Sequence, residues 1–263
     1  MIDPSSVGEP LLPDERMTDR RTLRAAQATP VARRAKPRRW NWLYAVALVI
    51  TLSIVAFNIL RPITVLPRIA PAPGFALVDE AGQTVTSEDL RGHFTLYSFS
   101  YLDCDGACPQ SLADIDALRH AMGERLPAGT PLSFVTITLD PERDTVERLA
   151  DTAAPLAPDQ EAFGWQLLTG DPLRTRYIVG GGFNVYYSDP QEPTADSPGR
   201  ITFDPRYVLV DQLGIMRAEY RTGQLDPELL TRDVNYLINE AENSQGVARL
   251  GYEAAHLFLC YPR

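Results

Sequence analysis

Two cysteines lie between a run of strand-forming residues and a helix, and this arrangement constrains the fold more than any other feature of the 263-residue sequence. The run Phe94 to Tyr101 (FTLYSFSY) is dense in β-forming residues and predicts a buried strand. Cys104 and Cys108 follow it. After Pro109, apolar residues recur at helical spacing as far as Gly123, which we expect to end that helix. A strand therefore runs into the cysteine loop, and a helix leaves it.

The residues that follow extend this beginning into an α/β domain. Further strand-like runs occur at residues 132–139, 163–168, 207–211 and 215–220. One helix is expected over residues 144–154, and an amphipathic helix is expected after the capping sequence Asp226-Pro227-Glu228. A strand, a helix and a strand in succession predict a parallel sheet, and the last two runs predict a hairpin.

An uncharged apolar run from Trp40 to Leu60 predicts a single transmembrane helix, because about 20 such residues cross a hydrocarbon core of about 30 Å. A cleaved signal peptide would have a shorter apolar core. Residues 20–39 carry eight basic side chains and no acidic one, which by the positive-inside rule keeps the N-terminus in the cytoplasm. We therefore expect a cell-membrane protein whose globular domain lies on the periplasmic or extracellular side.

Charge and proline content divide the rest of the chain. Residues 1–39 hold nine basic and five acidic side chains, a balance of +4, so the total of −9 leaves −13 beyond them. We expect this tail to be disordered, and the acidic remainder argues against nucleic acid as a partner. The proline-rich residues 61–74 predict an extended linker. The domain is expected over 75–243, with an apolar C-terminal extension over 244–263.

The position of Cys104 and Cys108 favours thiol or copper chemistry. Backbone N–H groups and the positive end of a helix can stabilise thiolates between a strand and a helix. If the pair lies on one helical turn, its Cα atoms are about 6 Å apart, which suits a disulfide or a shared metal. Two soft thiolates suit Cu(I), whereas a structural zinc site needs four ligands. A static disulfide is the alternative.

Four stretches of the sequence resemble the Sco/SenC family of thioredoxin-like copper proteins, which take part in cytochrome c oxidase assembly. They are FALVDEAGQTVTSEDLRG, SYLDCDGACP, TITLDPERDT, and FNVYY at residues 183–187. The CxxxC spacing differs from the CxxC of thioredoxins. The resemblance covers about residues 74–240. It implies a thioredoxin-like fold with a central mixed β-sheet flanked by helices, and it implies copper, favoured as Cu(I), with Cys104 and Cys108 as its ligands.

One position departs from the family pattern. The family normally supplies a histidine copper ligand just before the hairpin, and counting back from Leu213-Gly214 places Phe203 there. A phenyl ring cannot coordinate copper as imidazole does. A two-thiolate Cu(I) site would remain, and binding of Cu(II) should be weakened.

Three histidines are candidates for a replacement ligand. His93 is expected to be a solvated turn residue, and His120 falls off the apolar stripe of its helix, so we expect it to be exposed. His256 stands four residues before Cys260, a spacing that brings both to one helical face. We favour the alternative in which this apolar tail docks on the domain or on a partner, because two residues do not define a metal site.

Three functions follow as hypotheses. The resemblance implies a copper metallochaperone whose partner is the copper subunit of a respiratory terminal oxidase. The second is an enzyme, a thiol-disulfide oxidoreductase that keeps the cysteines of a copper site reduced; either Cys104 or Cys108 could attack, because exposure and pKa decide which. The third is a docking or assembly subunit of a membrane respiratory complex. All three include the lipid bilayer as a partner.

Overall fold

Two units make up the chain in the computed structural model, residues 1–56 and 57–263. The structure describes residues 39–60, 64–104, 108–154, 163–191, 200–244, 246 and 248–258. The first unit contains most of α2 (Arg39–Leu60), which matches the predicted apolar run, and its large apolar side chains are exposed. Within the described residues, no helix combines the length and the apolar character needed to cross a membrane.

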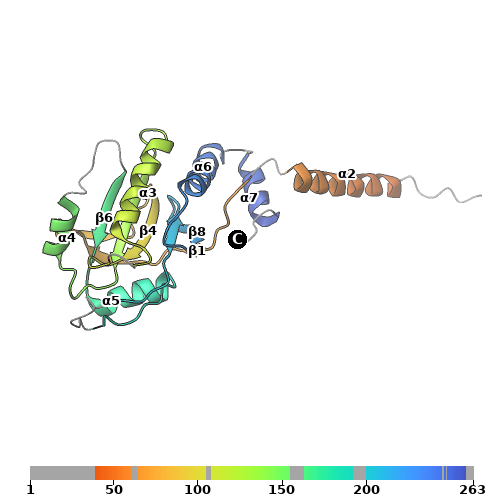
Figure 1. Cartoon of the computed structure of the whole chain (residues 1–263). Helices are drawn as coiled ribbons and strands as arrows, with labels where there is room; N and C mark the ends of the chain where they lie inside the picture. The colour runs from red at the N-terminus through yellow and green to blue at the C-terminus, as the bar shows by residue number, and fades with distance from the viewer. Residues whose placement is uncertain are drawn as a thin grey trace, which may run out of the picture. The chain divides into compact units, whose positions relative to one another are not determined.

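A six-stranded mixed sheet forms the centre of the second unit, in the order β1-β8-β7-β4-β5-β6 (Figure 1). Its strands are β1 (Ala70–Pro71), β4 (Phe94–Ser100), β5 (Leu132–Thr138), β6 (Gly164–Leu168), β7 (Tyr207–Val210) and β8 (Ile215–Tyr220). β4, β5 and β6 are parallel, whereas β7, β8 and β1 run antiparallel to their neighbours. The parallel β-α-β unit and the later hairpin are therefore confirmed.

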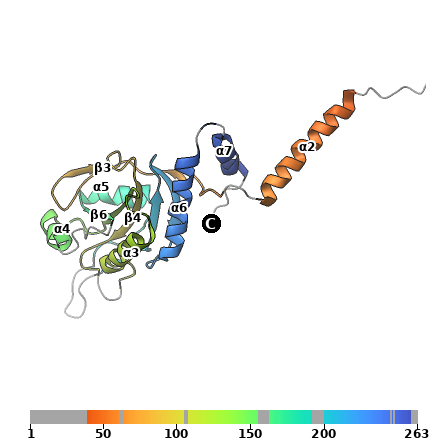
Figure 2. The same ribbon diagram turned by 90° about the horizontal axis from the view of Figure 1, so that it is seen from above.

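The remaining elements surround this sheet (Figure 1). They are the hairpin strands β2 (Ala76–Val78) and β3 (Thr84–Thr86), and the helices α3 (Leu112–Arg125), α4 (Val146–Ala153), α5 (Pro172–Arg176), the π-helix η2 (Tyr177–Gly182), α6 (Pro227–Asn243) and α7 (Ala248–Phe258). Figure 2 shows α3 and α6 on one side of the sheet and α5 on the other, and α7 lies beside α6. The predicted sheet flanked by helices is confirmed.

The central strand β4 is buried at every residue because both of its faces are covered. Leu96 belongs to an apolar cluster with side chains of α3 and α6. Its neighbours Tyr97 and Phe99 belong to a second cluster, with side chains of β2, β3 and η2. This alternation is the two-residue period of a strand. The second cluster also contains Cys104, so the opposite face of β4 leads into the cysteine loop.

The helix after the cysteines begins as expected but ends later. Ser111 and Asp114 form a capping box at the start of α3. The prediction that Gly123 ends this helix is wrong, because α3 continues to Arg125. A glycine inside a helix costs only about 1 kcal/mol. The helix instead ends at Leu126, which is extended and buried and precedes Pro127, a position that disfavours helical backbone.

The predicted linker at residues 61–74 lies within the second unit, and its described part, residues 64–74, packs on the domain. Val65 and Leu66 are buried, and β1 pairs with the edge strand β8 through Ala70 and Met216. Residues Ala70–Pro71 are therefore extended. An extended segment beside an open sheet edge can add a strand to it, so residues 64–74 belong to the domain.

Candidate thiol and copper site

The two predicted site cysteines come together at the end of β4. Their sulfur atoms are in bonding contact, and their Cα atoms are 5.3 Å apart. This separation lies within the range of about 4.4–6.8 Å that a disulfide requires. The same proximity allows both sulfurs to ligate one metal ion. The structure thus brings Cys104 and Cys108 into one site.

The surroundings of the two sulfurs differ. Cys104 is 5% exposed and belongs to the apolar cluster on one face of the sheet. Its Sγ lies 3.4 Å from the carbonyl oxygen of Gln110, to which a thiol can donate. Cys108 is half-buried and packs at the edge of the same cluster. The pair therefore has one inner and one outer member.

Gln110 links the cysteine loop to the segment before β7. Its side chain is fully buried; Nε2 donates to the carbonyl oxygen of Arg206 and Oε1 accepts from the N–H of Arg206, each at 3.2 Å. Its own carbonyl oxygen accepts from the Ser100 hydroxyl at 2.7 Å. Sequence reasoning missed Gln110, because nothing local signals a partner that lies 96 residues away.

Phe203 lies in the surroundings of Cys104. It forms an isolated β-bridge with Tyr187, is 6% exposed, and meets the ring of Tyr101 edge-on at 6.4 Å. It shares the apolar cluster of Cys104. Among the described residues, no group of three or more His, Cys, Asp or Glu side chains could hold a metal ion. The two sulfurs that the structure brings together would suit Cu(I), a soft ion that thiolates select.

Asp144 of the DPERDT segment holds the chain that leads into the site. Its carboxylate is 1% exposed, accepts from the N–H of Leu102 at 3.1 Å, and accepts from the Thr138 hydroxyl. Burial raises the pKa of Asp144 to about 6, although these two hydrogen bonds oppose the rise. Arg148 of α4 donates to Asp103 at 2.7 Å and lies 3.7 Å from Asp144. This motif, which supported the resemblance, thus fixes residues 102–103 just before Cys104.

The predicted start of α4 at Asp144 is two residues early. Thr145 is the N-cap, its hydroxyl accepts from the N–H of Arg148, and the helix begins at Val146. The carboxylate of Asp144 faces the strand and the cysteine loop instead. The sequence pattern could not separate these positions, because both Asp and Thr favour helix N-termini.

His93 has the predicted environment, because it is exposed in the turn before β4. His120 of α3 is half-buried as a residue, although its side chain is 43% exposed, and its Nδ1 lies 2.9 Å from the Asp116 carbonyl oxygen and 3.4 Å from the Asp116 carboxylate. Neither residue belongs to a metal-binding group in the described part of the chain.

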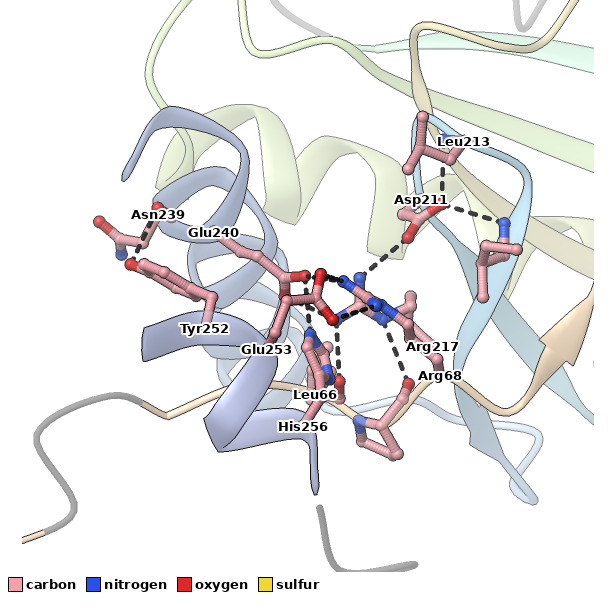
Figure 3. A network of polar contacts seen from close by, with 12 residues as sticks. Leu66, Arg68, Asp211, Leu213, Arg217, Asn239, Glu240, Tyr252, Glu253 and His256 are labelled. Carbon is pink, nitrogen blue, oxygen red and sulfur yellow. Dashed lines mark hydrogen bonds and ion pairs between the residues drawn. The ribbon is translucent and has the colours of Figure 1, made fainter. Parts of the chain in front are cut away.

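His256 has a carboxylate partner. Its Nε2 lies 2.9 Å from Glu240 of α6, and Glu240 also accepts from Arg217 at 2.6 Å (Figure 3). Burial favours a higher pKa for Glu240, but the hydrogen bonds with His256 and Arg217 outweigh it and lower that pKa to about 2. Cys260, the other half of the predicted pair, lies outside the described residues.

The same network ties α7 to the domain and to the segment before β1. Arg217 also donates to Asp211 at 2.9 Å and to the carbonyl oxygen of Leu66 at 2.8 Å, and Arg68 pairs with Glu253 of α7 at 3.2 Å. On α7, Ala255 is fully buried. Most of the described contacts of α7 with the rest of the domain are polar, and Leu250 of the predicted apolar tail is exposed.

Comparison with known proteins places the chain among copper-related proteins. The model of a family described as SCO1/SenC matches residues 68–239. The protein SCO1 homolog 1, mitochondrial, of Arabidopsis thaliana is 30% identical over 122 residues, which are 46% of this chain and 34% of that protein. A putative copper-binding protein of Stutzerimonas stutzeri is 36% identical over 89 residues, 33% of this chain and 42% of that protein. This chain thus spans less than half of the length of either relative.

A solved structure shows the same fold with copper. ScoI of Bradyrhizobium japonicum with copper bound has a TM-score of 0.51 and 27% identity, over 64% of this chain and 99% of that one. Since the family model matches well over half of the residues, including the cysteine loop, the chain belongs to the SCO1/SenC family.

Proposed function

We propose that this protein is a membrane-anchored copper metallochaperone that carries Cu(I) on Cys104 and Cys108 to the copper site of a respiratory terminal oxidase. The observation that carries the proposal is the paired sulfurs at the end of β4, in a chain whose relative ScoI has been solved with copper bound. Thiolates select Cu(I) over harder metal ions. The assembly role and the oxidase partner rest on the family resemblance.

The donor set supports delivery of Cu(I) in particular. Copper is the cargo here, so the site must both hold the ion and release it to a partner. Two sulfurs can hold Cu(I), while Cu(II) prefers a tetragonal set of nitrogen and oxygen ligands. With Phe203 in place of an imidazole, we expect weak binding of Cu(II) and ready release of Cu(I).

Membrane anchoring and an outward-facing domain belong to the same proposal. The uncharged run from Trp40 to Leu60 lies within α2, and eight basic residues over 20–39 precede it. These features support a single span with a cytoplasmic N-terminus. The lipid bilayer would then hold the domain near a membrane-bound oxidase.

The test is an anaerobic Cu(I) titration of the reduced, detergent-solubilised full chain against a competing chelator. We expect one Cu(I) per chain, lost in Cys104→Ser. Phe203→His should tighten Cu(I) binding and create a Cu(II) site, whereas Phe203→Leu, which removes the ring without adding a donor, should not. Failure of the wild-type chain to compete for Cu(I) would exclude copper delivery.

A thiol-disulfide oxidoreductase is the second candidate, and the bonding geometry of the two sulfurs favours it. Such an enzyme would reduce a disulfide in the copper site of its target and end with its own pair oxidised. It needs no third ligand, so the presence of Phe203 would not matter. Reduction of a disulfide-containing copper-site domain by the copper-free protein, combined with no Cu(I) binding, would select this function.

A further inference from the structure

We propose that Cys108 is the sulfur that exchanges with partners, and that Cys104 is the inner sulfur that completes each exchange. The inference deepens the proposed function, because it assigns different roles to the two members of the same site. It rests on that proposal only in the use of this pair, and it applies both to copper transfer and to thiol exchange.

Access distinguishes the two sulfurs. Thiol-disulfide exchange requires an incoming sulfur to approach the sulfur that it attacks, so the exposed member of a pair reacts first. Cys104 is 5% exposed and lies in the apolar cluster that contains Tyr101 and Phe203. Cys108 is half-buried at the edge of that cluster. A partner can therefore reach Cys108 before Cys104.

The backbone contacts of the loop favour the same order. The Sγ of Cys104 lies 3.4 Å from the carbonyl oxygen of Gln110, so this sulfur is held against the buried part of the loop. That carbonyl group is held in place, because it also accepts from Ser100 and because the side chain of Gln110 is bonded to Arg206. Cys104 is thereby held at the buried end of the cysteine loop, where it can complete an exchange that begins at Cys108.

The loop that follows Cys108 is fixed from the other side by Gly223. A Cβ atom at Gly223 would lie 1.5 Å from the carbonyl oxygen of Pro109, so the two backbones are in direct contact. Pro109 itself is exposed. Cys108 is thus presented at the edge of the site by a backbone that is held between Gly223 and the buried Gln110.

The exchange with a disulfide-bearing partner then has two steps. The Cys108 thiolate attacks one partner sulfur; a Cys108–partner disulfide forms, the partner disulfide breaks, and its second sulfur leaves as a thiolate. That thiolate takes the proton of Cys104. The Cys104 thiolate attacks the sulfur of Cys108, forms the Cys104–Cys108 disulfide and releases the first partner sulfur as a second thiolate. Two electrons pass from the pair to the partner. In copper transfer, the same order makes Cys108 the first ligand that the partner replaces.

The test measures the reactivity of each sulfur alone. The full chain carries Cys260→Ser to remove the third cysteine, together with either Cys104→Ser or Cys108→Ser. The reduced, copper-free variants react with 5,5′-dithiobis(2-nitrobenzoic acid), and release of the coloured thiolate is followed. The variant that retains Cys108 should react at least about tenfold faster than the one that retains Cys104. In denaturant the two rates should be equal.

Equal native rates, or a faster Cys104, would overturn the assignment. Should either serine variant fail to fold by circular dichroism, the reduced wild-type chain is treated with substoichiometric iodoacetamide, and the label on each cysteine is quantified by mass spectrometry. Preferential labelling of Cys108 supports the assignment, and equal or reversed labelling contradicts it. Neither assay contains copper, so its outcome is independent of whether the pair binds Cu(I) in the titration above.

Discussion

Asp144 should make the folded protein less stable at neutral pH than at mildly acidic pH. Its carboxyl is almost fully buried, and its pKa is raised from 3.8 to about 6 in the folded chain. A carboxyl with a raised folded pKa contributes stability that is complete below its unfolded pKa and is lost as the pH rises through the folded value. For Asp144 this window runs from 3.8 to about 6. At about 1.4 kcal/mol per pH unit, the change amounts to about 3 kcal/mol.

Asp144→Asn isolates this effect, because an amide oxygen can still accept from Leu102 and Thr138 but carries no charge. The free energy of unfolding is measured by urea denaturation of wild type and variant at intervals from about pH 4 to about pH 8. The variant should gain about 2.4 kcal/mol relative to wild type across this range, because a small part of the change already lies below about pH 4. A difference that stays constant with pH, or that falls, would refute the assignment of this shift to Asp144.

Thr138→Val provides a matched control with a side chain of nearly the same shape. The Thr138 hydroxyl donates to Asp144 and opposes the rise in its pKa. Without that bond, the pKa of Asp144 should rise further, and the loss of stability should extend to higher pH. If the pH window moved down instead, the hydrogen bond would not act as its geometry indicates.

Three other substitutions test the supports of the site and of the C-terminal helix. Gly223→Ala should destabilise the fold by more than about 2 kcal/mol, because its Cβ would overlap the carbonyl oxygen of Pro109; thermal unfolding checks this. Gln110→Leu should cost about 2–6 kcal/mol, since it leaves two buried backbone groups unpaired at about 1–3 kcal/mol each; urea unfolding measures it. Glu240→Gln should cost about 3–5 kcal/mol and increase amide hydrogen exchange in α7 at neutral pH, because a buried ion pair loses one partner. In wild type, this stabilisation should be present above pH 4.5 and disappear as the pH falls through about 2.

The elements of the fold were predictable where the pattern is local. The run at residues 94–101 is dense in β-forming residues, as expected for β4, which is covered on both faces. The turn and capping residues between such runs indicate where strands and helices begin. The failure at Gly123 has a physical cause: a weak local preference for ending the helix is outweighed by the burial of Leu126 and the restriction imposed by Pro127. Local patterns therefore predict which elements occur better than they predict where each one ends.

The sequence predicts the two cysteines of the site, but it does not predict the residues that hold the cysteine loop in place. Cys104 and Cys108 stand out by spacing alone, whereas Gln110 and Gly223 acquire their roles from contacts with distant parts of the chain. The same holds for His256, whose helical spacing pointed to Cys260 while its described partner is Glu240 of another helix. A single sequence carries no local trace of such long-range pairs.

Phe203 and Cys104 belong to the same buried apolar cluster. A histidine at this position would place ring nitrogens among the apolar side chains that surround Tyr101, and each nitrogen would need a partner such as a metal ion. A phenyl ring needs no such partner, so it can remain in this apolar cluster whether or not copper is bound. The phenyl ring offers no metal ligand, and it belongs to the same apolar cluster as Cys104. Such a site should favour Cu(I) on thiolates over Cu(II), and it should pass its cargo or its disulfide through Cys108.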